Sequence, residues 1–333
     1  MKVNTNKTLH RFSQWYFIFC CSMCVLVVLL PYWPTHELFI IPKYVLLFGP
    51  RWWLLSCIIL LLFFWTQLSK KQLLSSVLLF FISLNFLGFQ LPSISTYFST
   101  ANNEQELTIV SANVGGGGSS SGINFIAENL QPDFILLQEA RNINFTTMFT
   151  DYLFKECISG LCFFSKHPFE QTKVLSRKAF GGWGDFAIFY QVETESGSIS
   201  LANVHFETPR SVLMGAIHRS FDVKLATETD NNRQLQAILL SLWAKNRGHT
   251  LIIGDFNMPT DENIYQTHFS TLNNALDVKG LGFNATKHTF WHGITIDHVL
   301  YSNDFQLVDV EVVSPFSGDH RPIISRLKIK ISG

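Results

Sequence analysis

A chain of 333 residues has room for one large domain and a second, smaller unit. Its 25 basic and 25 acidic residues balance overall, but residues 1–100 hold seven of the basic residues and only one acidic residue. Residues 101–333 therefore contain 18 basic and 24 acidic residues, a net charge of −6. An acidic domain argues against non-specific nucleic-acid binding, which depends on basic surface and counterion release.

Three apolar segments occupy the first third of the chain. They cover residues 15–30, 52–68 and 73–91, carry no charge and are about as long as a membrane-spanning helix. We therefore expect residues 1–91 to form a membrane region with three transmembrane helices. The alternative is two helices plus a signal peptide or a re-entrant hairpin, although the first segment lacks a small-x-small cleavage site.

The basic residues of this region predict its orientation. Those that precede the first segment or separate the second from the third are Lys2, Lys7, Arg11, Lys70 and Lys71. By the positive-inside rule these parts are cytoplasmic, so three spans place the rest of the chain on the far side. Lys43 and Arg51, between the first two segments, weigh against this orientation. The expected location is a bacterial inner membrane, with the large domain on the periplasmic or extracellular side.

Residues 92–106 are polar and predict a linker, and residues 107–333 predict one domain of short strands and few helices. Strands are expected at 107–112, 134–137, 186–192, 198–204, 251–253, 296–301, 305–313 and 323–331, and helices at 123–129 and 232–245. In the second helix, Leu235, Ile238, Leu239 and Leu242 have the spacing of a stripe that faces a core. This pattern predicts an α/β or α+β domain of packed sheets covered by helices.

Cys157 and Cys162 are the two cysteines of the large domain, and they flank a predicted hairpin turn. A disulfide in an oxidising compartment and two free thiols on neighbouring strands are both compatible with this spacing.

The segment Leu-Ile-Ile-Gly-Asp-Phe-Asn, residues 251–257, predicts a buried strand that ends in a tight turn. The turn carries a carboxylate, Asp255, and an amide, Asn257. A rigid strand end aims such side chains into a cleft, but the same residue types also suit a simple strand-closing turn. The rest of the domain decides between these interpretations.

Other polar side chains follow or interrupt strand-like segments of the domain. They are Asn113, Gln138, Glu139, His205, Asp297, Asp319 and His320. Carboxylate and amide oxygens suit Mg²⁺, and histidine can donate to a phosphate or protonate a leaving group. Together these residue types predict a site that handles a hard cation and a phosphoryl group.

In order and approximate spacing, these motifs resemble the endonuclease/exonuclease/phosphatase superfamily, which includes apurinic endonucleases, DNase-like nucleases, neutral sphingomyelinases and inositol-polyphosphate phosphatases. The resemblance covers residues 107–331. It implies a four-layer α/β (α+β) sandwich, in which two packed mixed β-sheets are flanked by helices. It also implies a hydrolase of phosphate esters that uses Mg²⁺, with Mn²⁺ as the alternative ion.

For the metal, the resemblance implies three residues. Glu139 is the principal ligand, Asn113 lies beside it, and Asp319 supports the metal or its waters. Asn113 could instead cap a turn before the glycines at 115–118, and Asp319 could be an N-cap or Asx-turn residue.

For the chemistry, the resemblance implies in-line attack of water on phosphorus. Asp255 orients and deprotonates the water, and Asn257 helps to hold that water and a phosphate oxygen. His320 contacts the phosphate and stabilises its charge, Asp297 fixes the tautomer of His320, and His205 is a second phosphate donor, with a core histidine as the alternative for His205.

Arg210, five residues after His205, is a candidate substrate contact, with an exposed loop arginine as the alternative. Arg177 and Trp183 are candidates for the phosphate-contacting Arg or Tyr that the family has between its Glu and first His motifs. Four histidines have no assigned role and are expected at the surface: His218, His288, His292 and His298.

The sequence therefore predicts a membrane-anchored, divalent-metal-dependent phosphoesterase that acts on a lipid headgroup or a small phosphodiester. An extracytoplasmic nuclease is the alternative, and a catalytically silent binding or sensing domain is a third hypothesis. The expected partners are the membrane and a phosphate-ester substrate, and no obligate protein partner is indicated.

Overall fold

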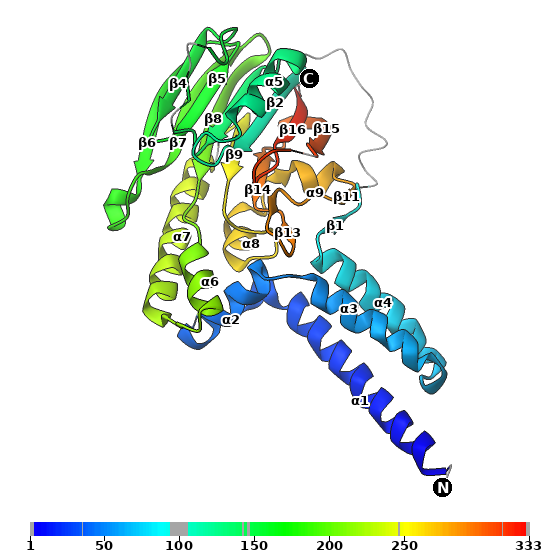
Figure 1. Ribbon diagram of the computed structural model, residues 1–333. Coiled ribbons are helices and arrows are strands. Elements are labelled where there is room, and N and C mark those ends of the chain that lie inside the picture. The colour runs from blue at the N-terminus through cyan, green and yellow to red at the C-terminus, as the bar shows by residue number, and fades with distance from the viewer. Residues whose placement is uncertain are drawn as a thin grey trace.

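The computed structural model describes residues 3–34, 36–93, 106–141, 143–144, 147–245, 247–314 and 316–330. Two β-sheets pack face to face in the large domain (Figure 1). The first sheet has the order β10 (Asn273–Asn274), β14 (Asp297–Tyr301), β9 (Thr250–Asp255), β8 (Gly197–His205), β7 (Asp185–Thr194) and β6 (Phe169–Ser176). The second has the order β15 (Phe305–Val312), β16 (Ile323–Ile329), β2 (Glu106–Asn113), β3 (Phe134–Gln138), β5 (Leu161–Ser165) and β4 (Phe154–Ile158).

Both sheets are mixed. β2 and β3 are parallel, as are β8 and β9, and the other neighbouring pairs in the two sheets are antiparallel. The prediction of two packed mixed sheets is therefore confirmed.

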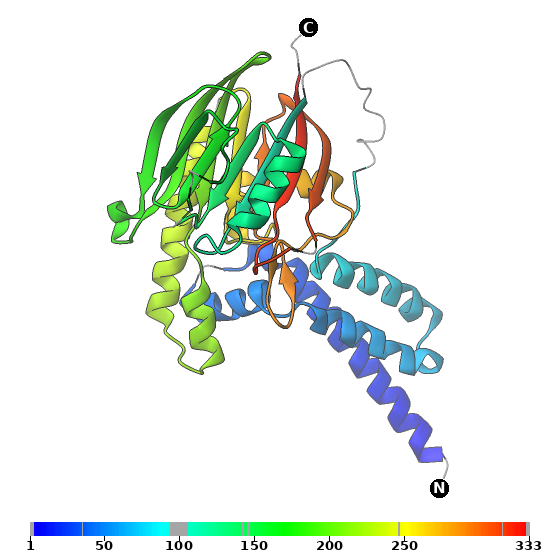
Figure 2. The same cartoon turned by 45° about the horizontal axis from the view of Figure 1, so that its top comes forward.

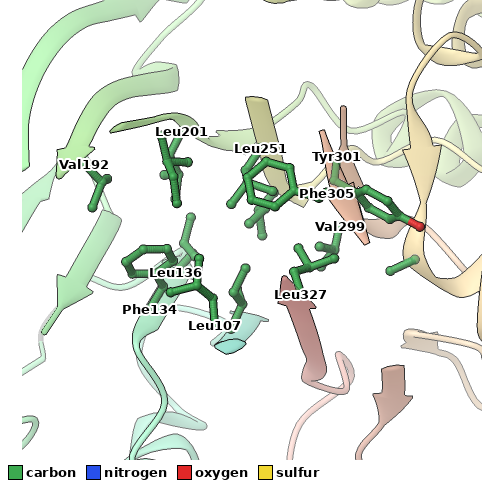
Figure 3. Packing of buried hydrophobic residues seen from close by; sticks show 14 of the residues in the cluster. Leu107, Phe134, Leu136, Val192, Leu201, Leu251, Val299, Tyr301, Phe305 and Leu327 are labelled. Atoms are coloured by element: carbon green, nitrogen blue, oxygen red, sulfur yellow. The ribbon is translucent and has the colours of Figure 1, made fainter. Parts of the chain in front are cut away.

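The core between the sheets consists of apolar side chains from both inner faces. Leu107 and Leu136 of the second sheet lie opposite Leu201 and Leu251 of the first, and all four are at most 1% exposed (Figure 3). Successive residues of a strand point to opposite faces, so Ile252 belongs to a different cluster, on the outer side of its sheet. Because helices cover the outer faces, the central strands are apolar on both sides and form continuous hydrophobic runs.

Helices flank the sheets. α7 (Val223–Ala244) and α8 (Asn263–Phe269) cover the outer face of the first sheet, and α5 (Ser120–Leu130) covers that of the second (Figure 2). The short α9 (Ala275–Lys279) packs beside β14 and β15.

The buried face of α7 is not the predicted one. Leu235, Leu239 and Leu242 are 43%, 38% and 62% exposed, whereas Arg233 and Gln236 are fully buried. The helix also begins at Val223, nine residues before the predicted start at 232. A hydrophobic pattern identifies only apolar contacts, and this helix buries polar residues against partners that are distant in sequence.

The N-terminal region contains α1 (Val3–Val28), η1 (Leu30–Tyr32), α2 (Glu37–Phe48), α3 (Trp52–Leu60), η2 (Leu61–Gln67) and α4 (Lys70–Phe86). The expectation of three transmembrane helices is wrong. In the described part of the chain, α1 is the only single helix that is long and apolar enough to cross a membrane. The segment of α1 that qualifies is Lys7–Val28. Residues 37–48 and 52–67 reach such a length only as a pair, and this pair is bent by 78°.

The third predicted span fails because its helix stops early. α4 has 17 residues, about 26 Å at 1.5 Å per residue, which is shorter than the roughly 30 Å of a bilayer core. After Gly88, with φ of 92°, β1 (Phe89–Gln90) pairs with β11 (Gly282–Phe283) of the large domain. Residues 87–91 thus lie outside the helix, and two of them, Phe89 and Gln90, pair with a strand of the large domain.

The N-terminal region is packed against the large domain. α2 contacts α7 and also α6 (Arg210–Ile217), which follows β8 (Figure 1). The predicted linker at 92–106 falls mostly on residues outside the described ranges, and β2 begins at Glu106.

Candidate functional site

The two parallel strand pairs bring the predicted polar residues to one edge of the sandwich. In the second sheet, Asn113 at the end of β2 is level with Gln138 at the end of β3. In the first sheet, His205 ends β8 directly beside Asp255 at the end of β9, and Asp297 begins β14 on its other side. Parallel strands end at the same edge, so each pair delivers two polar side chains to one place.

Asn113 links the two sheets at this edge. Its Nδ2 donates to Asp255 Oδ2 at 2.9 Å and to Glu139 Oε1 at 3.1 Å. Its Oδ1 accepts from the backbone N–H of Gly115 at 3.0 Å. The side chain therefore both caps the turn before the glycines and faces the site, so the two interpretations of Asn113 are compatible.

The Asp255 turn has a defined geometry. Asp255 is 1% exposed, and its Oδ1 accepts from the backbone N–H of Asn257 at 2.8 Å. Asn257 has a left-handed φ of 48°, and its Nδ2 donates to Phe206 O at 3.0 Å. At Gly254, with φ of 143°, a Cβ would lie 2.0 Å from the carbonyl oxygen of Val204, so only glycine fits.

Two histidines face the Asp255 carboxylate. The distance from Asp255 Oδ2 to His205 Nε2 is 3.8 Å, and to His320 Nε2 it is also 3.8 Å. His205 Nε2 is 3.6 Å from Glu139 Oε1. These distances exceed a hydrogen bond, so the groups surround a common space without bonding directly across it. Behind this space, His320 Nδ1 lies 3.0 Å from Asp297 Oδ2.

Burial and neighbouring charges give the two histidines opposite protonation states. Burial, with the charge of Arg177, lowers the pKa of His205 to about 4. Burial would also lower the pKa of His320, but the Asp297 carboxylate outweighs it and raises the value to about 9. At neutral pH, His320 is thus a cation that can hold a phosphate oxygen, whereas His205 is neutral.

The two buried aspartates also differ. Burial, with the charge of Asp297 nearby, raises the pKa of Asp255 to about 7, which suits a proton acceptor near neutral pH. Burial acts in the same direction on Asp297, but the imidazolium of His320 outweighs it, so the pKa of Asp297 is lowered.

The donor set at this edge fits a divalent cation. Asp255, Asp297 and His320 each offer a ligand atom within 4.8 Å of the others, and the Glu139 side chain is 44% exposed at the mouth of the same space. The carboxylate oxygens of Asp255, Asp297 and Glu139 are hard donors that suit Mg²⁺ or Mn²⁺, whereas His320 offers only a nitrogen and is protonated at neutral pH. Asn113 presents its amide nitrogen to the two carboxylates, so in this arrangement it orients Glu139 and Asp255 while its oxygen is held by the turn.

Asp319 and Arg210 lie apart from this cluster. The side chain of Asp319 is 60% exposed and forms an ion pair with Lys287 of β12 (Lys287–His288). Arg210 is exposed in the first turn of α6. No contact among the described residues joins either side chain to Glu139 or Asp255.

Two of the residues singled out from the sequence, Arg177 and Gln138, support the site through contacts that were not predicted. Arg177 donates from Nη1 to Asp185 O at 3.1 Å and from Nη2 to His205 O, so it fixes the end of β8. Gln138 Nε2 donates to Asn203 Oδ1 at 2.9 Å, which joins the two sheets beneath the site. These partners are 28 and 65 residues apart, and no local sequence signal identifies such pairs.

Of the four unassigned histidines, His218 is exposed, His288 and His292 are partly buried, and His298 is buried. His298 is fully buried, where its Nε2 lies 2.8 Å from Met258 O and its Nδ1 lies 3.1 Å from Asn274 Nδ2. His292 is partly buried and donates to the carbonyl of Phe48 in α2 at 2.8 Å. The expectation that these histidines are at the surface is therefore wrong for His298 and incomplete for His292, because both bond to distant backbone.

The family profile described as Endonuclease/Exonuclease/phosphatase family matches residues 110–320 of this sequence. This range contains all the polar residues of the cluster described above. No curated protein matches the sequence.

Solved structures with the same fold share little sequence with this chain. An endonuclease/exonuclease/phosphatase from Beutenbergia cavernae DSM 12333 aligns with a TM-score of 0.52 and 15% identity, over 68% of this chain and 72% of that one. The 3′ phosphatase NExo from Neisseria, bound to a product DNA hairpin, gives 0.51 and 12%, over 66% and 98%. The human Nocturnin catalytic domain with a bound sulfate anion gives 0.50 and 17%, over 69% and 97%. At these identities the likeness shows the fold alone.

Proposed function

Because the chain belongs to the endonuclease/exonuclease/phosphatase family, whose members are metal-dependent hydrolases of phosphate esters, we propose that it is a membrane-anchored phosphoesterase that uses Mg²⁺ or Mn²⁺. The observation that carries this proposal is the convergence of Glu139, His205, Asp255, Asp297 and His320 on one space at a single edge of the sandwich. The favoured substrate is a phospholipid headgroup or a small phosphodiester.

The arrangement supports in-line attack of water on phosphorus. Asp255 is fixed at both oxygens by Asn113 and Asn257, and with a pKa of about 7 it can accept a proton from the attacking water. His320, protonated and held by Asp297, stabilises the charge on the phosphoryl oxygens. A divalent cation bound through Glu139 would supply Lewis-acid polarisation of the phosphoryl group.

The proposed location is the far side of a membrane that α1 crosses. Lys7 and Arg11 lie in the N-terminal part of the candidate span Lys7–Val28, so the positive-inside rule places that end on the cytoplasmic side, the same orientation that three spans predict. Lys43 and Arg51, which argued against this orientation, pair with Asp230 and Asp261 of the large domain and are not free loop charges. The disulfide between Cys157 of β4 and Cys162 of β5 supports an oxidising compartment.

Exposed aromatic residues support a lipid substrate. Phe290 and Trp291, at the tip of the hairpin formed by β12 and β13 (Gly293–Ile294), are 91% and 70% exposed. Ile217, the last residue of α6, and Phe221, in the segment after it, are 70% and 62% exposed. Both tips lie at the end of the domain where the N-terminal helices attach (Figure 1). An exposed Trp is typical of a membrane interface, exposed apolar side chains beside it can contact lipid, and β8 and β9 end on this side of the domain.

A nuclease is the second candidate, and one local feature favours it. The guanidinium of Arg141, two residues after Glu139, lies 5.7 Å from the ring centre of Trp183, which is 78% exposed. With Lys178 they line a cavity of about 310 Å³. A basic and aromatic surface of this kind can hold a nucleic-acid strand by charge and stacking, despite the acidic domain.

The test uses the full chain in detergent with a generic aryl phosphodiester, with and without Mg²⁺ or Mn²⁺. We expect metal-dependent turnover that Asp255→Ala abolishes and that Asp309→Ala, at an exposed aspartate of β15, leaves within twofold of the parent. Metal-independent turnover, or equal turnover by Asp255→Ala, would contradict the proposed chemistry.

The same preparation then distinguishes the substrates. Mixed phospholipid vesicles, DNA and RNA are compared at low and at physiological salt. The lipid proposal predicts turnover of vesicles, with little of the salt dependence that binding to a polyanion gives. Salt-sensitive turnover of DNA or RNA alone would establish the nuclease instead. A folded domain that turns over none of them would favour the silent binding domain.

A further inference from the structure

Helix α2 is packed into the large domain although it lies outside the range that the family profile matches. Its apolar residues, such as Ile40 and Leu47, share one buried cluster with Val212 of α6, Ala226 of α7 and Ile296, the residue before Asp297. A helix of the membrane region thus contacts the segments that lead into and out of the candidate site.

Polar side chains in this interface are buried with the apolar ones. Lys43 is 1% exposed, Tyr44 is fully buried, and Asp230 of α7 is 5% exposed. Lys43 Nζ and Tyr44 Oη both donate to Asp230 Oδ1, the latter at 2.9 Å. A buried carboxylate that loses such donors carries an uncompensated charge, so these contacts depend strongly on one another.

The same network continues from α2 to the Asp255 turn. Arg233 donates from Nη1 to Tyr44 Oη at 3.2 Å, and it forms a bidentate ion pair with Glu262 at 2.5 and 2.9 Å. Its Nη2 also donates to Asn257 O at 2.6 Å. The backbone N–H of Asn257 in turn donates to Asp255 Oδ1 at 2.8 Å.

Two further contacts anchor the end of α2 and the turn that follows it to loops beside the site. Arg51 Nη2 donates to Asp261 Oδ1 at 2.8 Å, and Asp261 lies four residues after Asn257. His292 Nε2 donates to Phe48 O at 2.8 Å, on the segment that leads to Asp297. Residues of the N-terminal region therefore form hydrogen bonds to the segments on both sides of the site.

The turn needs an external support because its conformation is unfavourable by itself. Asn257 has a left-handed φ of 48°, which costs about 1 kcal/mol or more unless surrounding contacts enforce it. Arg233 supplies one of these contacts, and the position of the Arg233 guanidinium is set by Glu262 on one side and Tyr44 on the other.

We propose that α2 is an integral element of the catalytic domain and that its Tyr44, together with Arg233, is a positioning residue for the Asp255–Asn257 turn. The catalytic competence of the site then depends on α2 being docked, so the membrane region controls activity as well as location. This inference rests on the proposed phosphoesterase function for its kinetic consequence, but its structural consequence can be measured without turnover.

The decisive variant is Tyr44→Phe, which removes one hydroxyl and leaves the ring and every charge in place. Its matched control is Tyr152→Phe, which removes a buried hydroxyl that donates to Pro132 O at 2.9 Å, far from the network. A second pair is Lys43→Met and Lys224→Met, because Lys224 forms an exposed ion pair with Glu228 on the same α7.

The first measurement is amide hydrogen exchange of the full chain in detergent. For Tyr44→Phe and Lys43→Met we expect about tenfold faster exchange of the Asn257 amide, the change that loss of one net hydrogen bond of about 1.4 kcal/mol gives. The amides of Leu251 and Ile253 in β9 should stay within twofold of the parent, as should all three amides in both control variants.

The second measurement is steady-state turnover of the aryl phosphodiester. For Tyr44→Phe we expect kcat to fall about tenfold with KM within twofold, because the main effect is on Asp255, the residue that orients and deprotonates the attacking water. Exchange of Asn257 that stays within twofold of the parent in both variants would overturn the inference. So would equally faster exchange throughout β9, because the network would then stabilise only the whole fold. If the parent turns over no phosphoester, the proposed function fails while the exchange measurement still decides the inference.

Discussion

Asp297 controls the charge of His320, and Asp297→Asn is the perturbation that tests this role. The carboxylate lies 3.0 Å from His320 Nδ1 and is 3% exposed, so its charge is little screened by solvent. Asparagine keeps the size of the side chain but removes its charge. His320 would then resemble the fully buried His298, whose pKa burial lowers to about 4.

The magnitude follows from the shift that Asp297 maintains. The pKa of His320 is about 9 instead of 6.5, although burial opposes the increase. Without Asp297 the value should fall below 6.5, a change worth about 3 kcal/mol or more at 1.36 kcal/mol per unit. At pH 8, His320 would change from about nine-tenths protonated to less than about 3% protonated. If phosphate stabilisation requires the imidazolium, kcat/KM at pH 8 should fall about 30-fold.

Two assays check this reasoning. An NMR titration of the His320 ring in the metal-free protein should give a pKa near 9 in the parent and below 6.5 in Asp297→Asn. The pH profile of kcat/KM on the aryl phosphodiester should lose its alkaline activity in the variant, with Asp309→Asn as the control at an exposed aspartate. An unchanged His320 titration would refute the electrostatic argument. A loss of activity that is the same at every pH would refute the role of the His320 charge in catalysis.

Three further predictions concern metal, pH and the disulfide. Glu139→Gln should weaken Mn²⁺ binding at least tenfold in a calorimetric titration, because the most exposed carboxylate of the site loses its charge; unchanged binding would exclude it as a ligand. Burial lowers the pKa of His298 to about 4, so the neutral side chain contributes about 3 kcal/mol to the free energy of unfolding above pH 6.5. This contribution is lost as the pH falls from 6.5 towards 4. In chemical denaturation, His298→Gln should reduce this pH dependence, and the same slope as the parent would contradict the assignment. Replacing Cys157 and Cys162 by Ser should lower the free energy of unfolding by about 2 kcal/mol, as expected for a short loop, with kcat within twofold; a large loss of kcat would show that the bridge also shapes the site.

The sequence identified most of the candidate site because the chemistry is encoded locally. Glu139, His205 and Asp255 each end an apolar run, so their type and position are visible without knowledge of the fold. The roles of supporting residues were not visible in the same way. Arg177 was a candidate for contacting phosphate, but its guanidinium donates to the backbone carbonyls of Asp185 and His205.

The errors occurred where long-range contacts override local patterns. Hydropathy predicted three spans, but α4 ends at Phe86 and the chain after it pairs with β11. Periodicity predicted that Leu235 and Leu239 face the core, but the buried face of α7 carries Arg233, and its polar partners include α2, close to 190 residues away in sequence. An apolar pattern cannot indicate that a charged side chain will be buried and paired.

The sequence by itself therefore determined the class of the large domain, the positions of most of its central strands and the polar residue types that meet at the candidate site. Each depends on neighbours within a few residues, through alternation along a strand or a polar residue at its end. Only the tertiary structure decided the protonation states of His205 and His320, the supports of the Asp255 turn and the docking of α2. Those properties depend on burial and on charges brought together from distant parts of the chain, which exist only after the two sheets and α2 have packed.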